Sequence, residues 1–194
     1  MRTLGDLIYW QYAKIIAGSA GIGKTQYGFV MQRFKQLQSG RIGWDSLREY
    51  VKEREDSEHC IYCGRADSMT QDHLFPTARN GPDVEKNVVW VCGRCNASKG
   101  KRRPYEYWTV RGGLRAAKYE MPRLAEGKYL KLLHGLLDEA GLLDSDAAAV
   151  RSRICPSCDL RPLCEREDSA GKLSPLCLDG AATMALRTSR IAGA

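Results

Sequence analysis

The chain has 194 residues, of which 43% are hydrophobic and 27% are charged, and its formal net charge is +7 at pH 7. This composition indicates a globular protein with one domain and appendages, or with two small domains. No apolar run approaches the length of a membrane span, so we expect no membrane partner. Residues 1–6 show no signal-peptide pattern, and the eight cysteines fall into two groups of four that look like metal sites. The expected location is therefore the reducing cytoplasm.

The first 55 residues are expected to form a helical N-terminal extension. Apolar residues recur with helical spacing over residues 4–16, behind a capping-box-like pair formed by Thr3 and Asp6. Further apolar patterns predict a second helix that begins near Tyr27 and a third around residues 44–51.

Residues 18–25, from Gly18 to Thr25, match the phosphate-binding P-loop pattern in every required position. A P-loop must follow a buried strand, whereas the residues before Gly18 have helical spacing. A P-loop nucleotide hydrolase is therefore kept only as an alternative, and a glycine-rich connection between two helices is the preferred interpretation.

Two paired-cysteine motifs, Cys60-x2-Cys63 and Cys92-x2-Cys95, enclose a loop of 28 residues. Structural zinc prefers four such ligands arranged in a tetrahedron. A segment of about 50 residues is too short to bury a secure core alone, so a metal ion would stabilise it. We expect these four cysteines to hold structural Zn²⁺ and to perform no chemistry.

The enclosed loop contains polar residues between two strand-like runs. Residues 68–74 read as a strand that delivers Asp72 and His73 at its end, and residues 87–91 read as the returning strand of a hairpin. A helical, basic stretch opens from Asn96. A neutral histidine is a natural base near pH 7, and carboxylate and amide oxygens such as those of Asp72 and Asn96 suit Mg²⁺.

His73, Asn87 and Asn96 lie fourteen and then nine residues apart. This pattern, inside the four-cysteine frame, resembles the HNH, or ββα-metal, nuclease family over residues 56–110. The resemblance implies an α+β fold in which a zinc-stapled ββα-metal core is flanked by helical segments. It also implies an endonuclease that cuts phosphodiester bonds with one metal ion and leaves 5′-phosphate and 3′-hydroxyl ends.

The same resemblance assigns roles to individual residues. His73 would be the general base, Asp72 and Asn96 would hold the catalytic metal, and Asn87 would fix the loop and orient His73. Many members have a histidine where this chain has Asn96, and that difference shifts the expected metal towards Mg²⁺ or Mn²⁺. DNA is the expected partner, with a homodimer if the enzyme makes double-strand breaks. The main alternative is a non-catalytic, zinc-dependent nucleic-acid-binding module.

Residues 97–123 contain eight basic side chains and two acidic ones, interleaved with aromatic residues. Such a stretch beside the expected metal site is typical of a phosphate-contacting surface. The residues expected to contact nucleic acid are Lys99, Lys101, Arg102, Arg103, Arg111 and Arg115.

The remaining segment, residues 111–194, is expected to be a helical region with a second four-cysteine cluster. Its members are Cys155, Cys158, Cys164 and Cys177. Four thiolates suit either zinc or a [4Fe–4S] cluster, and zinc is favoured as the commoner ion in small proteins.

Overall fold

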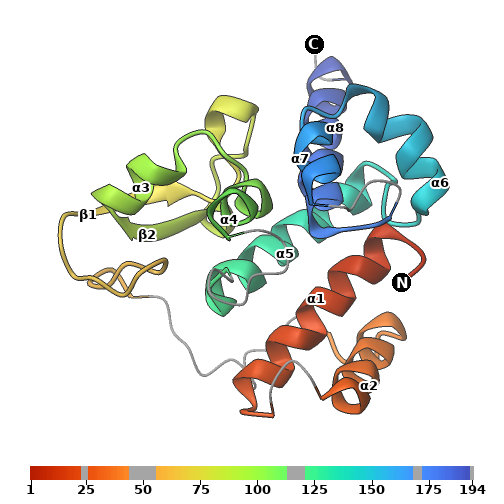
Figure 1. Cartoon of the computed structure of the whole chain (residues 1–194), viewed down its shortest axis with the longest axis horizontal. Coiled ribbons are helices and arrows are strands. Elements are labelled where there is room, and N and C mark those ends of the chain that lie inside the picture. Colours follow the sequence, from red (N-terminus) through yellow and green to blue (C-terminus); the bar gives the residue numbers. More distant parts are fainter. Residues whose placement is uncertain (23–25, 44–55, 113–120, 168–171, 193–194) are drawn as a thin grey trace.

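The computed structural model describes residues 1–22, 26–43, 56–112, 121–167 and 172–192. Helices dominate, and one two-stranded sheet lies at one side of the molecule (Figure 1), so the fold is α+β as predicted. The longer helices are α1 (Leu4–Ser19), α2 (Tyr27–Gln38), α3 (Gly93–Lys99), α4 (Pro104–Gly112), α5 (Arg123–Glu139), α7 (Arg161–Arg166) and α8 (Pro175–Ala192). The shorter turns are η2 (Thr77–Arg79), η3 (Glu85–Asn87), α6 (Ala147–Ala149), η5 (Val150–Ile154) and η6 (Cys155–Ser157).

The sheet is an antiparallel hairpin of β1 (Met69–His73) and β2 (Val88–Cys92). Its register places Asp72 opposite Val89 and His73 opposite Val88. The β-branched Val89 and Val91 face inward and are fully buried, as the alternation of a half-buried strand requires. Helix α3 packs against both strands, which completes the predicted order of strand, loop, strand and helix.

Helix α1 begins where the sequence indicates, because the Thr3 side chain caps it by accepting a hydrogen bond from the Asp6 backbone N–H. The helix runs through Gly18 to Ser19. The element before the glycine-rich segment is therefore a helix, which a P-loop cannot follow. Residues 23–25, which complete that motif, and the helix expected around residues 44–51 lie outside the described residues.

Helix α5 forms the middle of the molecule in Figure 1 and contacts α1 on one side and α8 on another. Helix α4 also contacts α8. Their apolar faces share one hydrophobic core that includes Ile8, Tyr129 and Leu178 and extends to Val89 under the hairpin. In the described part of the chain, no helix is long and apolar enough to cross a membrane.

Candidate active site and metal centre

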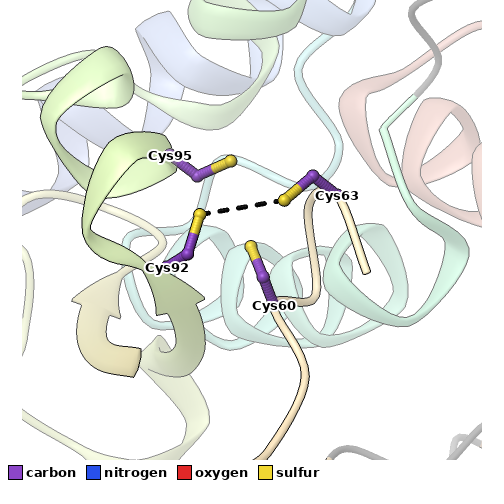
Figure 2. Close-up of side chains that lie close together, drawn as sticks. All are labelled: Cys60, Cys63, Cys92 and Cys95. Atoms are coloured by element: carbon purple, nitrogen blue, oxygen red, sulfur yellow. Dashed lines mark hydrogen bonds between the residues drawn. The ribbon is translucent and has the colours of Figure 1, made fainter. Parts of the chain in front are cut away.

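The four cysteines of the two C-x2-C motifs meet at the base of the hairpin. In Figure 2 the sulfur atoms of Cys60 and Cys63 face those of Cys92 and Cys95. All four ligand atoms lie within 4.8 Å of one another, and the Sγ atoms of Cys63 and Cys92 are 3.7 Å apart. With Zn–S bonds of 2.3 Å, sulfurs at the corners of a zinc tetrahedron stand about 3.8 Å apart. The group could therefore bind zinc, as the sequence predicted.

The local backbone and the electrostatics of this group both suit a metal ion. The first C-x2-C motif, Cys60–Cys63, is called the first cysteine knuckle below. The chain turns back just after it at Gly64, whose φ of 73° lies in the left-handed region that favours glycine. The pKa of Cys92 is lowered to about 7, chiefly because the Cys95 backbone N–H donates to its sulfur. Burial raises the pKa of Cys63 and of Cys95, so metal binding is what would hold these two as thiolates.

Asp72, near the end of β1, has a buried carboxylate with both of its oxygens engaged. Lys99 Nζ donates to Oδ1 over 3.0 Å, and the Tyr62 hydroxyl donates to Oδ2 over 3.2 Å. Burial raises the pKa of the Asp72 carboxyl, and the Lys99 ammonium partly offsets that rise. Tyr62 belongs to the first cysteine knuckle, so the candidate zinc centre positions a group that holds Asp72.

His73 follows Asp72 and remains partly accessible, with 28% of its side chain exposed. Its Nε2 atom lies 3.0 Å from Asp83 Oδ1, in the loop between the strands. Its backbone carbonyl accepts from Lys99 Nζ over 2.7 Å. Neither Asp83 nor this role of Lys99 could be predicted from the sequence, because both contacts depend on how the loop and α3 fold back.

Asn87 is fully buried just before β2 and ties the inter-strand loop together. Its Oδ1 accepts from the Phe75 N–H over 2.8 Å, and its Nδ2 donates to the carbonyls of Phe75 and Pro82. The chain passes so close at Gly81 that an added Cβ would lie 2.0 Å from the Phe75 oxygen. Asn87 thus holds the loop on which Asp83 stands.

Asn96 lies in the second turn of α3 and faces β1. Its Nδ2 donates over 3.5 Å to the backbone carbonyl of Gln71, the residue that precedes Asp72 in β1. The hairpin and α3 therefore bring Asp72, His73 and Asn96 to one region, with Asn87 beneath the adjoining loop.

Residues 60–107 match the HNH endonuclease family model. The matched segment, called the HNH module below, contains the four cysteines and the four polar residues. The chain is also similar to the CRISPR-associated endonuclease Cas9 of Corynebacterium diphtheriae, with 33% identity over 73 residues. That match covers 36% of this chain but only 7% of the relative's length. No solved structure matches the chain. The family match points to nuclease activity for the HNH module.

The basic residues in and after the HNH module do not all reach its surface, and this corrects two of the predictions. Lys99 is buried against Asp72, and Arg103 is fully buried, so neither presents its charge to nucleic acid. Both turn inward because the predicted basic helix is interrupted: Gly100, with φ of 53°, ends α3 and Pro104 begins α4. Of the six residues expected to contact nucleic acid, Lys101, Arg102 and Arg111 are exposed, whereas Arg115 lies outside the described residues.

Arg103 instead joins the HNH module to the C-terminal helices. Its Nη1 donates to Asp159 Oδ1 and to the Thr183 hydroxyl, each over 2.8 Å, and its Nε donates to Glu106 over 3.0 Å. Arg79 of the HNH module also binds Asp159, over 2.7 Å. The contacts with Asp159 and Thr183 could not be predicted from the sequence, since these partners lie 56 to 80 residues away along the chain.

The second group of cysteines is less tightly gathered than the first. Among the described residues, the first quartet is the one group of potential metal ligands whose atoms all lie within 4.8 Å of one another. Cys155, Cys158, Cys164 and Cys177 nevertheless line one cavity.

Proposed function

We propose that this protein is an HNH-type endonuclease that hydrolyses DNA phosphodiester bonds with a single divalent metal ion and His73 as its general base. The observation that supports the proposal is the 3.5 Å contact of Asn96 Nδ2 with the Gln71 carbonyl, which places Asn96 against the strand that carries Asp72 and His73. This contact lies inside the segment that matches the endonuclease family.

Asp72 and Asn96 would hold the catalytic ion. A carboxylate oxygen and an amide oxygen are the donors that Mg²⁺ and Mn²⁺ prefer, so the donor set fits a hard cation. The Asp72 oxygens contact Lys99 Nζ at 3.0 Å and the Tyr62 hydroxyl at 3.2 Å in this structure, so the ion would take the place of one of these contacts. When bound, the ion would neutralise charge on the phosphate and stabilise the leaving oxygen.

His73 would take the proton from the attacking water. If Nε2 carries the hydrogen, it donates to Asp83 Oδ1 across the 3.0 Å contact, and Nδ1 is left as the base. Asp83 is then a positioning residue that selects this tautomer. Asn87 acts one step further away, because it fixes the loop that carries Asp83.

Charge supports DNA as the substrate. Lys101, Arg102 and Arg111 are exposed just beyond α3, where their cations can meet backbone phosphates. The guanidinium of Arg111 also lies over the rings of Tyr107 and Trp108, at 5.2 and 5.3 Å from their centroids. That stacking fixes the direction of its charge.

Cleavage of supercoiled plasmid tests the proposal. The wild-type protein should cut with Mg²⁺ or Mn²⁺ and should stop when EDTA is added. The His73→Ala variant should lose about 10²–10⁴-fold in rate, the usual contribution of a general base, while it still binds DNA. His59→Ala is the matched control, because His59 is exposed and contacts Asp56 outside the site.

Two further outcomes separate the alternatives. Asp72→Ala and Asn96→Ala should lose activity through a weaker metal site, so excess Mn²⁺ should restore part of the rate. Salt-dependent binding without any cutting would instead identify a non-catalytic binding module. A linear first product would indicate paired active sites and hence a homodimer.

A further inference from the structure

The second cysteine group lies on the C-terminal side of the molecule, away from the HNH module's own quartet. Cys155 begins η6, Cys158 follows it, Cys164 lies in α7, and Cys177 lies in the first turn of α8. All four side chains line one cavity of about 360 Å³. At about 30 Å³ for each molecule of liquid water, this cavity has the volume of roughly twelve waters.

The spacing of the sulfurs differs from that in the first quartet. The first quartet gathers within 4.8 Å, close to the separation that one zinc ion requires, whereas no three of the second group do so. In a [4Fe–4S] cluster each thiolate binds a different iron at a corner of the cubane. Ligands of a cluster therefore stand farther apart than ligands that share a single zinc ion, and they surround a larger space.

The walls of the cavity suit an inorganic cluster with several thiolate ligands. Ile154 and Leu176 provide apolar sides that limit the access of water. Arg151 and Arg161 also line the cavity and place positive charge at its wall, which suits a group held by four negatively charged thiolates. The Ser174 backbone N–H donates to Cys177 Sγ over 3.5 Å, and such hydrogen bonds to sulfur are common around iron–sulfur clusters.

The surrounding fold restricts where Cys155 and Cys158 can lie. Helix α8 approaches so closely that a Cβ added at Gly180 would lie 3.0 Å from Cys158 Sγ. The residues before Cys155 form the π-helix η5, a widened turn that often occurs at functional sites.

We propose that Cys155, Cys158, Cys164 and Cys177 bind a [4Fe–4S] cluster. Each thiol transfers its proton to solvent as its sulfur binds one iron, and no change in oxidation state is needed for binding. The zinc ion favoured from the sequence would require all four sulfurs to close around one point, and the cavity between them would be lost.

The cluster would also hold the C-terminal region against the HNH module. Asp159 directly follows the ligand Cys158, and its two carboxylate oxygens bind Arg79 and Arg103. Fixing Cys158 therefore fixes Asp159 at the contact between the two regions. Loss of the cluster should loosen this contact without removing any residue of the proposed active site.

The test begins with the wild-type chain, purified without oxygen and then incubated with ferric iron, sulfide and a thiol, whose oxidation to a disulfide supplies the two electrons that bring half of the iron in each cluster to the ferrous state. We expect a brown protein that contains four irons and four acid-labile sulfides per chain, in addition to one zinc. Reduction with dithionite should bleach the visible absorption. A colourless chain with two zinc ions and no iron would overturn the proposal, as would a chain that binds one zinc and nothing else.

Paired cysteine variants locate the cluster. Cys164→Ser should lose most of the iron and sulfide and keep the zinc, whereas Cys63→Ser should lose zinc and keep the cluster. Iron content in Cys164→Ser equal to that of the wild type would place the iron elsewhere and would also overturn the proposal. The wild-type metal content decides the matter even if a variant fails to fold. None of these measurements depends on DNA cleavage.

Discussion

At the scale of single residues, the pair formed by Lys99 and Asp72 has the greatest consequence for the proposed site. Both side chains are buried, with exposures of 1% and 7%, and Nζ lies 3.0 Å from Oδ1. Removing two charges from water costs several kcal/mol for each ion, and their attraction repays this only while both are present. Lys99 also holds the His73 carbonyl, so it supports both residues at the end of β1.

Replacing Lys99 should expose that desolvation cost. We expect Lys99→Met to lower the free energy of unfolding by about 3–5 kcal/mol, since it leaves Asp72 buried without its cation. Lys101→Met is the matched control, because Lys101 is exposed. It should change stability by no more than about 0.5 kcal/mol. Urea denaturation of the zinc-loaded proteins without added Mg²⁺ measures both, and equal losses in the two variants would contradict the role of the pair.

The Lys99→Met variant also tests whether Asp72 binds the catalytic metal ion, through the effect of that ion on the melting temperature. An ion that binds at Asp72 stabilises the folded protein in proportion to its affinity. In Lys99→Met the carboxylate no longer shares its charge with an ammonium, so Mg²⁺ should raise the melting temperature more than in the wild type. If Mg²⁺ has the same effect on both proteins, the ion binds elsewhere.

Asn87 offers a second test at this scale, because its amide makes three hydrogen bonds within the loop. Asn87→Asp keeps the shape of the side chain but removes its NH₂ group. A carboxylate oxygen, which cannot donate a hydrogen bond, would then face the carbonyls of Phe75 and Pro82. An unsatisfied buried polar group costs about 1–3 kcal/mol, so we expect a loss of about 2–4 kcal/mol in unfolding free energy. Asn80→Asp in the same loop should be nearly neutral, since Asn80 uses its backbone N–H and adopts the left-handed conformation that Asp tolerates.

At the scale of elements, the first cysteine knuckle and the hairpin depend on each other. The Ile61 N–H donates to the Trp90 carbonyl of β2, and the Tyr62 hydroxyl from the same knuckle reaches Asp72. A hairpin of two strands is marginal in water without such support. Zinc at the four cysteines would therefore stabilise the strand that carries the proposed catalytic residues.

Loss of one zinc ligand should weaken the fold before it affects any catalytic step. We expect Cys60→Ser to lower the zinc content and the melting temperature, because bound zinc can contribute on the order of 10 kcal/mol to folding. At a temperature where the variant is still folded, its cleavage rate should stay near that of the wild type. A protein that melts normally with unchanged zinc content would contradict a structural role for this site.

The elements that the sequence predicted correctly are those defined by neighbouring residues. The Thr3 cap, helices α1 and α2 and the alternation in β2 all follow from patterns within a few turns of chain. The spacing of four cysteines was enough to predict their meeting. The burial of Lys99 and Arg103 was not predicted, because charged side chains are usually exposed. It depends on the helix break at Gly100 and on acidic partners that are distant in the sequence.

At the scale of the whole molecule, Arg103 connects the HNH module to the C-terminal helices. Its guanidinium is fully buried among Glu106, Asp159 and Thr183. The same junction includes Asp179, which accepts hydrogen bonds from the Glu106 N–H and the Tyr129 hydroxyl. Burial raises the pKa of Asp179 to about 6, and the charge of Arg103 works against that rise. One cation thus balances acidic residues from several elements.

Arg103→Met should therefore destabilise the entire chain. We expect the unfolding free energy to fall by about 3–5 kcal/mol, because the fully buried Asp179 and the partly buried Glu106 lose their common cation. Arg102→Met is the control: Arg102 is exposed and donates to the Ser98 carbonyl, so its loss should cost less than about 1 kcal/mol.

A double-mutant cycle with Asp159→Asn isolates one contact of this junction. Asp159 is 42% exposed, so solvent screening limits its coupling to Arg103 to about 1 kcal/mol, well below the full effect of Arg103→Met. Urea denaturation followed by both tryptophan fluorescence and circular dichroism makes the measurement. We expect the two signals to coincide in the wild type and to separate in Arg103→Met, as the C-terminal helices detach before the HNH module unfolds. Coincident transitions with unchanged stability in Arg103→Met would show that the hydrophobic contacts among α4, α5 and α8 hold the two regions together without this arginine.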